Sequence, residues 1–196
     1  MRYTIALFLV AALAACAAPE HASIRDGTAN VPAIETALPS RYAARNIPRD
    51  AVSGRRLIAD YLIVDKSERM LVVYYQGRPI KAYRGLQFGD VPAGHKRFQG
   101  DERTPEGVYT INRRNPQSRF HLSLGISYPN NSDLAFAERY GRSAGGDIFI
   151  HGQPNGLATD LRMRGDWTDG CIALSNAEIA ELWQIVPDGT RIEIRP

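Results

Sequence analysis

Cysteine and histidine are scarce in this sequence of 196 residues, which contains two cysteines and four histidines. Two cysteines cannot build the dense disulfide framework of a small secreted domain. No two histidines stand at the spacing of zinc ligands, so we expect no metal site, and no motif indicates a cofactor. We therefore expect a fold that depends on an ordinary hydrophobic core.

Long apolar runs and a strong excess of one charge are also lacking. The N-terminal apolar stretch, from about Ile5 to Ala15, is shorter than the roughly twenty residues of a membrane-spanning helix. The formal net charge of +3 and the pI near 9.0 arise from scattered residues. The densest basic cluster, "NRRNPQSR" at 112–119, is short and has no interleaved aromatics, so we expect no nucleic-acid partner.

The N-terminal segment has the basic start and short apolar core of an export signal. It ends in "LAAC" at 13–16, which resembles the lipobox of bacterial lipoproteins, where the peptide is cut before the cysteine and the new terminal thiol is lipidated. We expect residues 1–15 to be a signal peptide and Cys16 to carry the lipid. The protein would then be a periplasm-facing lipoprotein of the inner or outer membrane. An ordinary signal peptide, cut after Ala15 or Ala17, is the alternative.

The fate of Cys16 decides the state of Cys171. A disulfide between them is the ordinary expectation for two cysteines in an oxidising compartment. Lipidation of Cys16 would exclude that bond and leave Cys171 as a free thiol, which is a candidate reactive group.

The composition changes near residue 56. Residues 16–56 contain many alanines and several prolines without sustained periodicity, so we interpret them as a tether. Residues 57–196 are long enough for one domain with a buried core, and they show no internal repeat.

Strands predominate in that domain. Apolar and β-branched runs predict strands, and two segments with N-capping residues predict helices, of which the second has a capping box of Ser175 and Glu178. The fold class is therefore mainly β, a sandwich or closed barrel-like sheet with a few short helices. The expected strands are 57–65, two strands around Gln76 and Gly77 within 68–86, 108–114, 120–128, 146–152 and 190–196; the helices are 130–142 and 175–186; a glycine- and proline-rich loop is expected at 87–107.

Two residues near the C-terminal helix are candidates for catalysis. Cysteine catalysis needs a thiolate, a base that generates it and donors for the oxyanion. Cys171 follows Gly170 in a turn just before the expected helix, whose dipole would favour a thiolate if the helix begins close enough. The N–H groups of both residues are candidate oxyanion donors. His151, at the exit of the strand "DIFI", is the candidate base; a structural hydrogen-bonding role is the alternative.

His151 and the "TDGC" turn at 168–171 together resemble the signature of the L,D-transpeptidase catalytic domain, the YkuD family. That signature is a histidine, a spacer, and then Ser or Thr, His, Gly and Cys. The segments "GDERTPEGVYTI" (100–111) and "GGDIFIHG" (145–152) resemble further family elements. The resemblance covers roughly residues 57–196 and implies a mainly β sandwich or barrel-like core with the cysteine in a cleft.

The resemblance also implies a reaction on peptidoglycan stem peptides. Cys171 would attack the carbonyl of the L-centre of diaminopimelate, His151 would take the thiol proton, and the terminal D-alanine would leave. The acyl group would then pass to an amine of a neighbouring diaminopimelate or to the lysine of an envelope lipoprotein. The carbonyl of Gly152 occupies the position that orients the histidine in this family.

Two positions depart from the family signature. Asp169 stands in place of the second histidine, and Ala173 in place of an Asn or Arg. Asp169 would disfavour the neighbouring thiolate through like charge, orient a donor amine, or only shape the turn. Two alternatives to transpeptidation therefore stay open. One is a hydrolase on the same scaffold, as an L,D-carboxypeptidase or an enzyme that releases a wall protein; the other is a non-catalytic wall-binding lipoprotein.

Four further residues have weaker claims. Trp167 and Tyr128 either line the cleft or pack in the core. Arg119 and His121 either contact carboxylates of the stem peptide or form ordinary surface hydrogen bonds.

Overall fold

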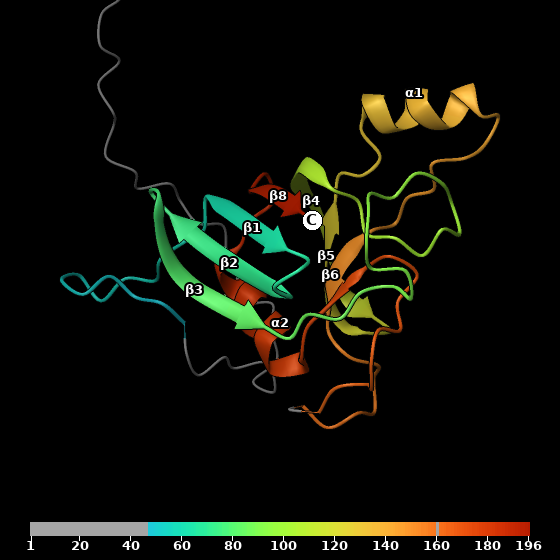
Figure 1. Cartoon of the computed structure of the whole chain (residues 1–196). Helices are drawn as coiled ribbons and strands as arrows, with labels where there is room; N and C mark the ends of the chain where they lie inside the picture. Colours follow the sequence, from blue (N-terminus) through green and yellow to red (C-terminus); the bar gives the residue numbers. More distant parts are fainter. Residues whose placement is uncertain (1–46, 160) are drawn as a thin grey trace, which may run out of the picture. The chain divides into compact units, whose positions relative to one another are not determined.

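A computed structural model of the chain describes residues 47–159 and 161–196. The expected signal peptide, the expected lipidation site Cys16 and most of the expected tether lie outside these ranges. The described residues form eight strands and two helices (Figure 1). None of these helices is long and apolar enough to cross a membrane.

The first half of the sheet is a meander with the C-terminal strand beside it. β1 (Tyr61–Asp65), β2 (Met70–Tyr75) and β3 (Arg78–Arg84) pair antiparallel in sequence order. β8 (Arg191–Arg195) pairs parallel with β1. Buried residues alternate with more exposed ones along β1 and β8, as one buried sheet face requires.

The second half of the sheet carries the candidate site. The long strand β4 (Gly107–Ser118) pairs with β8 through its first residues and with β5 (His121–Ile126) through the rest. β6 (Phe149–His151) pairs antiparallel with β5, and the two-residue strand β7 (Ile172–Ala173) pairs parallel with β6. The sheet order is therefore β3-β2-β1-β8-β4-β5-β6-β7. Two register shifts in β4 mark irregularities, which locally increase bend and twist.

The two helices begin at the predicted caps. α2 (Asn176–Ile185) starts with the capping box of Ser175 and Glu178 and packs against β5 and β6. Its side chains Ile179 and Leu182 are fully buried, and each burial contributes about 1.5–3 kcal/mol. α1 (Asn131–Arg139) lies away from α2 in Figure 1, and its Asp133 accepts a hydrogen bond from the Tyr109 hydroxyl of β4 at 3.0 Å. The predicted fold class, mainly β with a few short helices, is confirmed.

The condition for the helix dipole to act on Cys171 is not met, because the helix does not begin close enough to the thiol. Cys171 does not lie directly before a helix, because β7 and the helix cap separate it from α2. Ile172 and Ala173 pair with β6, and the backbone of Ala173 also exchanges two hydrogen bonds with Gln87. Four residues thus separate Cys171 from Asn176, the first residue of α2, and a helix dipole acts only near the first turn, so it does not favour the thiolate here.

Candidate active site

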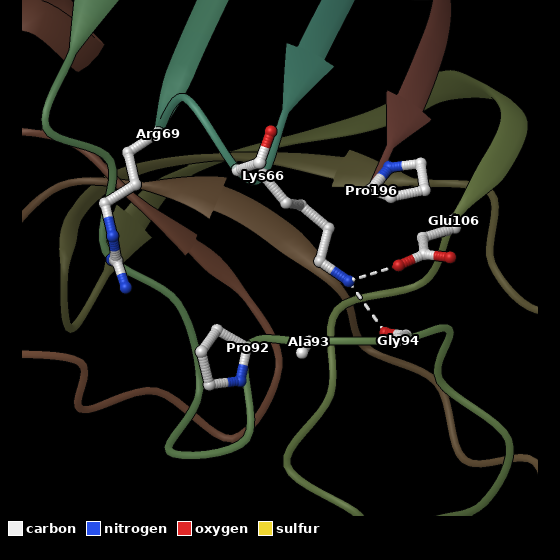
Figure 2. A pocket seen from close by; sticks show the side chains of 8 residues that line it. Lys66, Arg69, Pro92, Ala93, Gly94, Glu106 and Pro196 are labelled. Atoms are coloured by element: carbon white, nitrogen blue, oxygen red, sulfur yellow. Dashed lines mark hydrogen bonds and ion pairs between the residues drawn. The ribbon is translucent and has the colours of Figure 1, made fainter.

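The described part of the chain contains two hollows of interest, and the first offers little chemistry. It has a volume of about 290 Å³ and is lined by Lys66, Arg69, Glu106 and five further residues, none of them a cysteine or histidine. Figure 2 shows the ammonium of Lys66 reaching Glu106 Oε1 and the carbonyl oxygen of Gly94, each at 2.7 Å. Its charge is therefore satisfied within the protein.

The second hollow is a cleft of about 510 Å³ that contains both predicted catalytic side chains, His151 and Cys171. Its walls come from the tip of the β4–β5 hairpin, the segment that enters β6, and the turn before β7. Residues from distant parts of the sequence thus meet around one thiol.

The β6–β7 pairing places the two side chains on one face of the sheet. Ala173 lies opposite His151, and the backbone N–H of Phe149 donates to Sγ of Cys171 at 3.4 Å. Because side chains alternate along a strand, Cys171, two residues before Ala173, points to the same side as His151. The parallel pair therefore aims a thiol and an imidazole into the same cleft.

The imidazole of His151 is held in its neutral form. Its Nδ1 atom lies 2.7 Å from the carbonyl oxygen of Gly152, which can only accept, so Nδ1 carries the proton and Nε2 has a lone pair. Phe120 stacks on the imidazole and Trp167 meets it edge-on. This burial lowers the pKa of His151 to about 4, and the hydrogen bond to Gly152 opposes the shift only in part.

Cys171 is a free, partly exposed thiol that is protonated at neutral pH. Burial raises its pKa to about 11, against the hydrogen bond from Phe149. The charges of Asp169 and Asp147 raise the pKa further, whereas the ammonium of Lys96 lowers it. The like-charge effect expected of Asp169 on the thiolate is therefore present.

The turn that carries the thiol requires glycine at position 170. Gly170 has φ +117°, and a Cβ there would lie 2.5 Å from the carbonyl oxygen of Arg103. Thr104 Oγ1 donates to the Gly170 carbonyl at 2.9 Å, and Thr168 Oγ1 donates to the Cys171 carbonyl at 2.8 Å. The N–H of Gly170 donates to Thr168 Oγ1 at 3.2 Å, so this predicted oxyanion donor is engaged within the resting turn.

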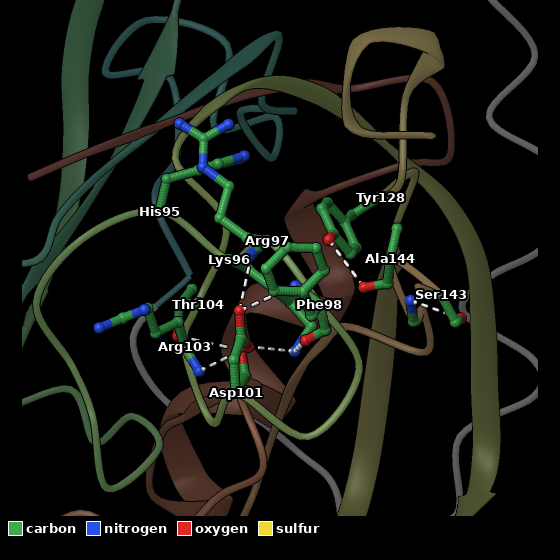
Figure 3. Close-up of polar contacts among 12 residues, drawn as sticks. His95, Lys96, Arg97, Phe98, Asp101, Arg103, Thr104, Tyr128, Ser143 and Ala144 are labelled. Atoms are coloured by element: carbon green, nitrogen blue, oxygen red, sulfur yellow. Dashed lines mark hydrogen bonds and ion pairs between the residues drawn. The ribbon is translucent and has the colours of Figure 1, made fainter. Parts of the chain in front are cut away.

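The loop at 95–104 forms the platform beneath this turn. Figure 3 shows its buried ion pair, in which Lys96 Nζ lies 2.8 Å from Asp101 Oδ1. Asp101 also accepts from the backbone N–H groups of Arg97, Phe98 and Arg103. The resemblance singled out part of this segment, but only the fold shows that Arg103 and Thr104 support the turn that carries Cys171.

Sequence reasoning missed two buried amides behind the cleft. Gln87 Oε1 accepts from Trp167 Nε1 at 3.3 Å and from Gln153 Nε2 at 3.1 Å. Gln153 Nε2 also donates to the carbonyl of Leu174 at 2.7 Å. The sequence did contain one sign of this role for Gln87, since a polar amide stands there between the apolar residues Leu86 and Phe88.

The other predicted residues divide into two groups. Trp167, Arg119 and the exposed Asp169 line the cleft. Tyr128 packs in the core with its hydroxyl on the carbonyl of Ala144, and His121 is not among the lining residues. Within 47–159 and 161–196, no group of three or more His, Cys, Asp or Glu residues could hold a metal ion.

A thiol and a neutral imidazole that line one cleft are the two groups that cysteine-dependent acyl-transfer enzymes use. Residues 59–194 match the model of the L,D-transpeptidase catalytic domain, and the chain belongs to this family, YkuD. The curated relative "Putative L,D-transpeptidase YafK" of Escherichia coli K12 is 29% identical over 132 residues, which make up 64% of this chain and 46% of that protein.

Solved structures share the fold. The helical cell shape determining protein Pgp2 of Campylobacter jejuni is 27% identical with a TM-score of 0.56, over 79% of this chain and 52% of Pgp2. Bd1075 of Bdellovibrio bacteriovorus is 24% identical with a TM-score of 0.50, over 78% of this chain and 52% of Bd1075. The chain thus spans about half the length of these relatives.

Proposed function

We propose that the domain is a cysteine acyltransferase acting on the stem peptides of bacterial peptidoglycan, in keeping with its family. The observation that carries the proposal is the pairing, in one cleft, of the Cys171 thiol with an imidazole whose Nε2 atom has no proton. This pair supplies the nucleophile and the base that thioester chemistry requires.

In the first half-reaction, Sγ of Cys171 attacks the carbonyl carbon at the L-centre of diaminopimelate in a stem tetrapeptide. The thiol proton moves to Nε2 of His151, and a tetrahedral intermediate with a negatively charged oxygen forms. The carbon–nitrogen bond to the terminal D-alanine then breaks, the leaving amine takes the proton from Nε2, and a thioester remains on Cys171.

In the second half-reaction, an amine attacks the thioester and gives one proton to Nε2 of His151. The bond between carbon and sulfur breaks, and the thiolate takes the proton back from the imidazole. The acceptor is the amine of a neighbouring diaminopimelate or the lysine of an envelope lipoprotein.

The proton moves during the attack rather than before it. Because burial lowers the pKa of His151 to about 4 and raises that of Cys171 to about 11, both groups are neutral near pH 7. A preformed thiolate–imidazolium pair would place two charges in a poorly solvated site. Transfer of the proton as the sulfur–carbon bond forms avoids that resting state.

The proposed oxyanion donors are the N–H groups of Gly170 and Cys171. The first would leave Thr168 Oγ1, its resting partner, and turn to the substrate oxygen. The hydroxyl of Thr168 would keep its hydrogen bond to the Cys171 carbonyl, which holds the turn during this change.

Hydrolysis of the thioester is the second candidate, and the position of Asp169 favours it. This carboxylate replaces the family's second histidine, lines the cleft and is exposed. A carboxylate at this place can accept a proton from a water that attacks the thioester. The same scaffold would then act as an L,D-carboxypeptidase or release a protein from the wall.

The test is mass spectrometry of the domain incubated with disaccharide-tetrapeptide, with Cys171→Ala as the matched control. A dimer joined between two diaminopimelates, absent with the variant, supports transpeptidation. A tripeptide alone supports carboxypeptidase activity. A folded wild-type domain that forms neither a product nor an acyl adduct contradicts the enzyme proposal and leaves the non-catalytic wall-binding lipoprotein.

We also propose that Cys16 carries a lipid that anchors the protein in the cell envelope. The proposal rests on the lipobox-like "LAAC" at 13–16. Labelling with an alkyne-bearing fatty acid in a bacterial host should mark the full chain but not the Cys16→Ser variant. Equal labelling of both chains would refute it.

A further inference from the structure

The tip of the β4–β5 hairpin reaches into the catalytic cleft. Ser118 pairs with His121, so Arg119 and Phe120 alone make the turn between the two strands. Phe120 covers the imidazole of His151, with ring centroids 4.7 Å apart. Arg119 is exposed and lines the same cleft.

The backbone of this turn is tightly held. Asn155 donates its backbone N–H to the Arg119 carbonyl and its Nδ2 to the Ser118 carbonyl, each at 3.0 Å. Its Oδ1 accepts from the N–H of His121 at 3.0 Å, and the N–H of Gly152 donates to the Phe120 carbonyl at 3.0 Å. The base of the Arg119 side chain is therefore fixed relative to the strand that carries His151.

The guanidinium of Arg119 has no carboxylate partner among the residues that the structure describes. Its recorded neighbour is the Phe120 ring, 6.0 Å from its central carbon. No other Lys or Arg belongs to the described lining of the cleft, whereas Asp147 and Asp169 do. Asp147 is paired with Arg113 at 2.6 Å, so it does not neutralise Arg119.

We propose that Arg119 binds a free carboxylate of the stem peptide and selects substrates that carry it; the inference rests on the proposed function. An arginine presents paired N–H donors that match the two oxygens of a carboxylate. A fixed backbone lowers the ordering cost of such a contact. A peptide with an uncharged group at that place leaves the cation without a partner.

Among the carboxylates of the tetrapeptide, two belong to the residues on either side of the scissile bond, and the position of Arg119 favours that of the terminal D-alanine. His151 protonates the leaving amine, so the D-alanine lies on the His151 side of the cleft. Arg119 is next to Phe120, the residue stacked on that imidazole. The other source is the side-chain carboxylate of diaminopimelate, on the far side of the scissile bond.

The experiment compares three substrates with the full chain: the tetrapeptide, its C-terminal amide, and the tetrapeptide amidated at the side-chain carboxylate of diaminopimelate. The enzymes are wild type, Arg119→Ala, Arg119→Lys and the charge-matched control Arg78→Ala. Arg78 is exposed on β3, at the opposite edge of the sheet from β6 and β7. Circular dichroism and thermal unfolding establish that each variant is folded.

We expect Arg119→Ala to lower kcat/KM for the free tetrapeptide by roughly 10- to 100-fold, as for a lost charge-assisted hydrogen bond. For the C-terminal amide, the kcat/KM of this variant should be close to that of the wild type, because that substrate has no terminal carboxylate for Arg119 to bind. For the free tetrapeptide, the kcat/KM of Arg119→Lys should lie between those of the wild type and Arg119→Ala. That of Arg78→Ala should match the wild type.

Discrimination confined to the diaminopimelate amide would support carboxylate binding by Arg119 but assign it to the other carboxylate. Equal turnover of all three substrates by the wild type would overturn the inference while leaving the proposed function intact. An equal loss on all three with Arg119→Ala would also overturn it, since a purely structural role predicts that pattern. A wild type that forms no thioester on any substrate would instead contradict the proposed function itself.

Discussion

The ring of Phe120 lies over the imidazole of His151, with centroids 4.7 Å apart and planes inclined by 26°. Trp167 meets the same imidazole at 5.5 Å and 63°. Aromatic cover on two sides excludes water from the proposed base, which explains why its pKa falls so far below the ordinary value.

Replacing Phe120 by Ala should raise the pKa of His151 from about 4 toward its ordinary value of 6.5, since hydration favours the charged imidazolium. The acid limb of the pH–rate profile for thioester formation should move upward by about 1 to 2 pH units. NMR titration of the imidazole gives the same pKa directly. Phe120→Leu, which keeps apolar cover, should shift it less; an unmoved acid limb in Phe120→Ala would contradict the role assigned to burial.

Replacing Asp169 by Asn should make the thiol more reactive. The negative charge of Asp169 raises the pKa of Cys171, so its removal should lower that pKa and increase the thiolate fraction at any pH below it. We expect the iodoacetamide alkylation rate at pH 8 to rise about two- to tenfold. The control is Glu68→Gln, which removes an exposed charge from the β1–β2 turn and should leave the alkylation rate unchanged. A slower reaction in Asp169→Asn would show that the carboxylate assists the thiol instead.

Replacing Gly170 by Ala should destabilise the domain by about 3 kcal/mol, from backbone strain and steric overlap together. The positive φ and the 2.5 Å approach to the Arg103 carbonyl both oppose a Cβ. Gly165→Ala is the matched control, because Gly165 has φ +66° but open space around its Cβ position, and should cost only about 1 kcal/mol. Urea unfolding of both variants measures the difference. Equal losses of unfolding free energy would mean that the loop at 95–104 shifts easily to make room for the Cβ.

The Lys96–Asp101 pair should make stability depend on acid pH. Burial opposes ionisation of Asp101, but Lys96 and three backbone N–H groups outweigh it and hold its pKa below the ordinary 3.8. Such a group stabilises the fold above its unfolded pKa, and the stabilisation is lost as pH falls through the folded pKa. The gap in unfolding free energy between wild type and Asp101→Asn should therefore be largest near neutral pH and shrink below about pH 4. Asp90→Asn, an exposed carboxylate of the same loop, should show a small gap at every pH.

Features with local sequence signals were predictable. The capping box of Ser175 and Glu178, and the turn at Gln76 and Gly77, are read within four residues, and both are present. The positions of His151 and Cys171 could be named because the motif around them is specific, and the fold brings both into one cleft.

Features that depend on long-range contacts were not predictable from one sequence. Nothing local indicates that Ile172 and Ala173 form a strand, because the backbone of Gln87 that completes their pairing is distant in sequence. The support of Gly170 by Arg103 and the stacking of Phe120 on His151 are likewise contacts between remote segments. These contacts set the turn geometry and the pKa values, so the site's chemistry required the fold.

Both ends of the long loop at 87–107 are attached to the segment that carries Cys171. At the first end Gln87 pairs with Ala173 and the Phe88 carbonyl accepts from the N–H of Thr168, and at the second end Thr104 donates to the Gly170 carbonyl. Its outer part, around Asp90 and Val91, is exposed. Because the entropy of loop closure grows only slowly with length, insertions there cost little as long as both attachments persist. A longer or altered outer part of the loop can therefore change what the domain contacts and still leave the positions of Cys171 and His151 as they are.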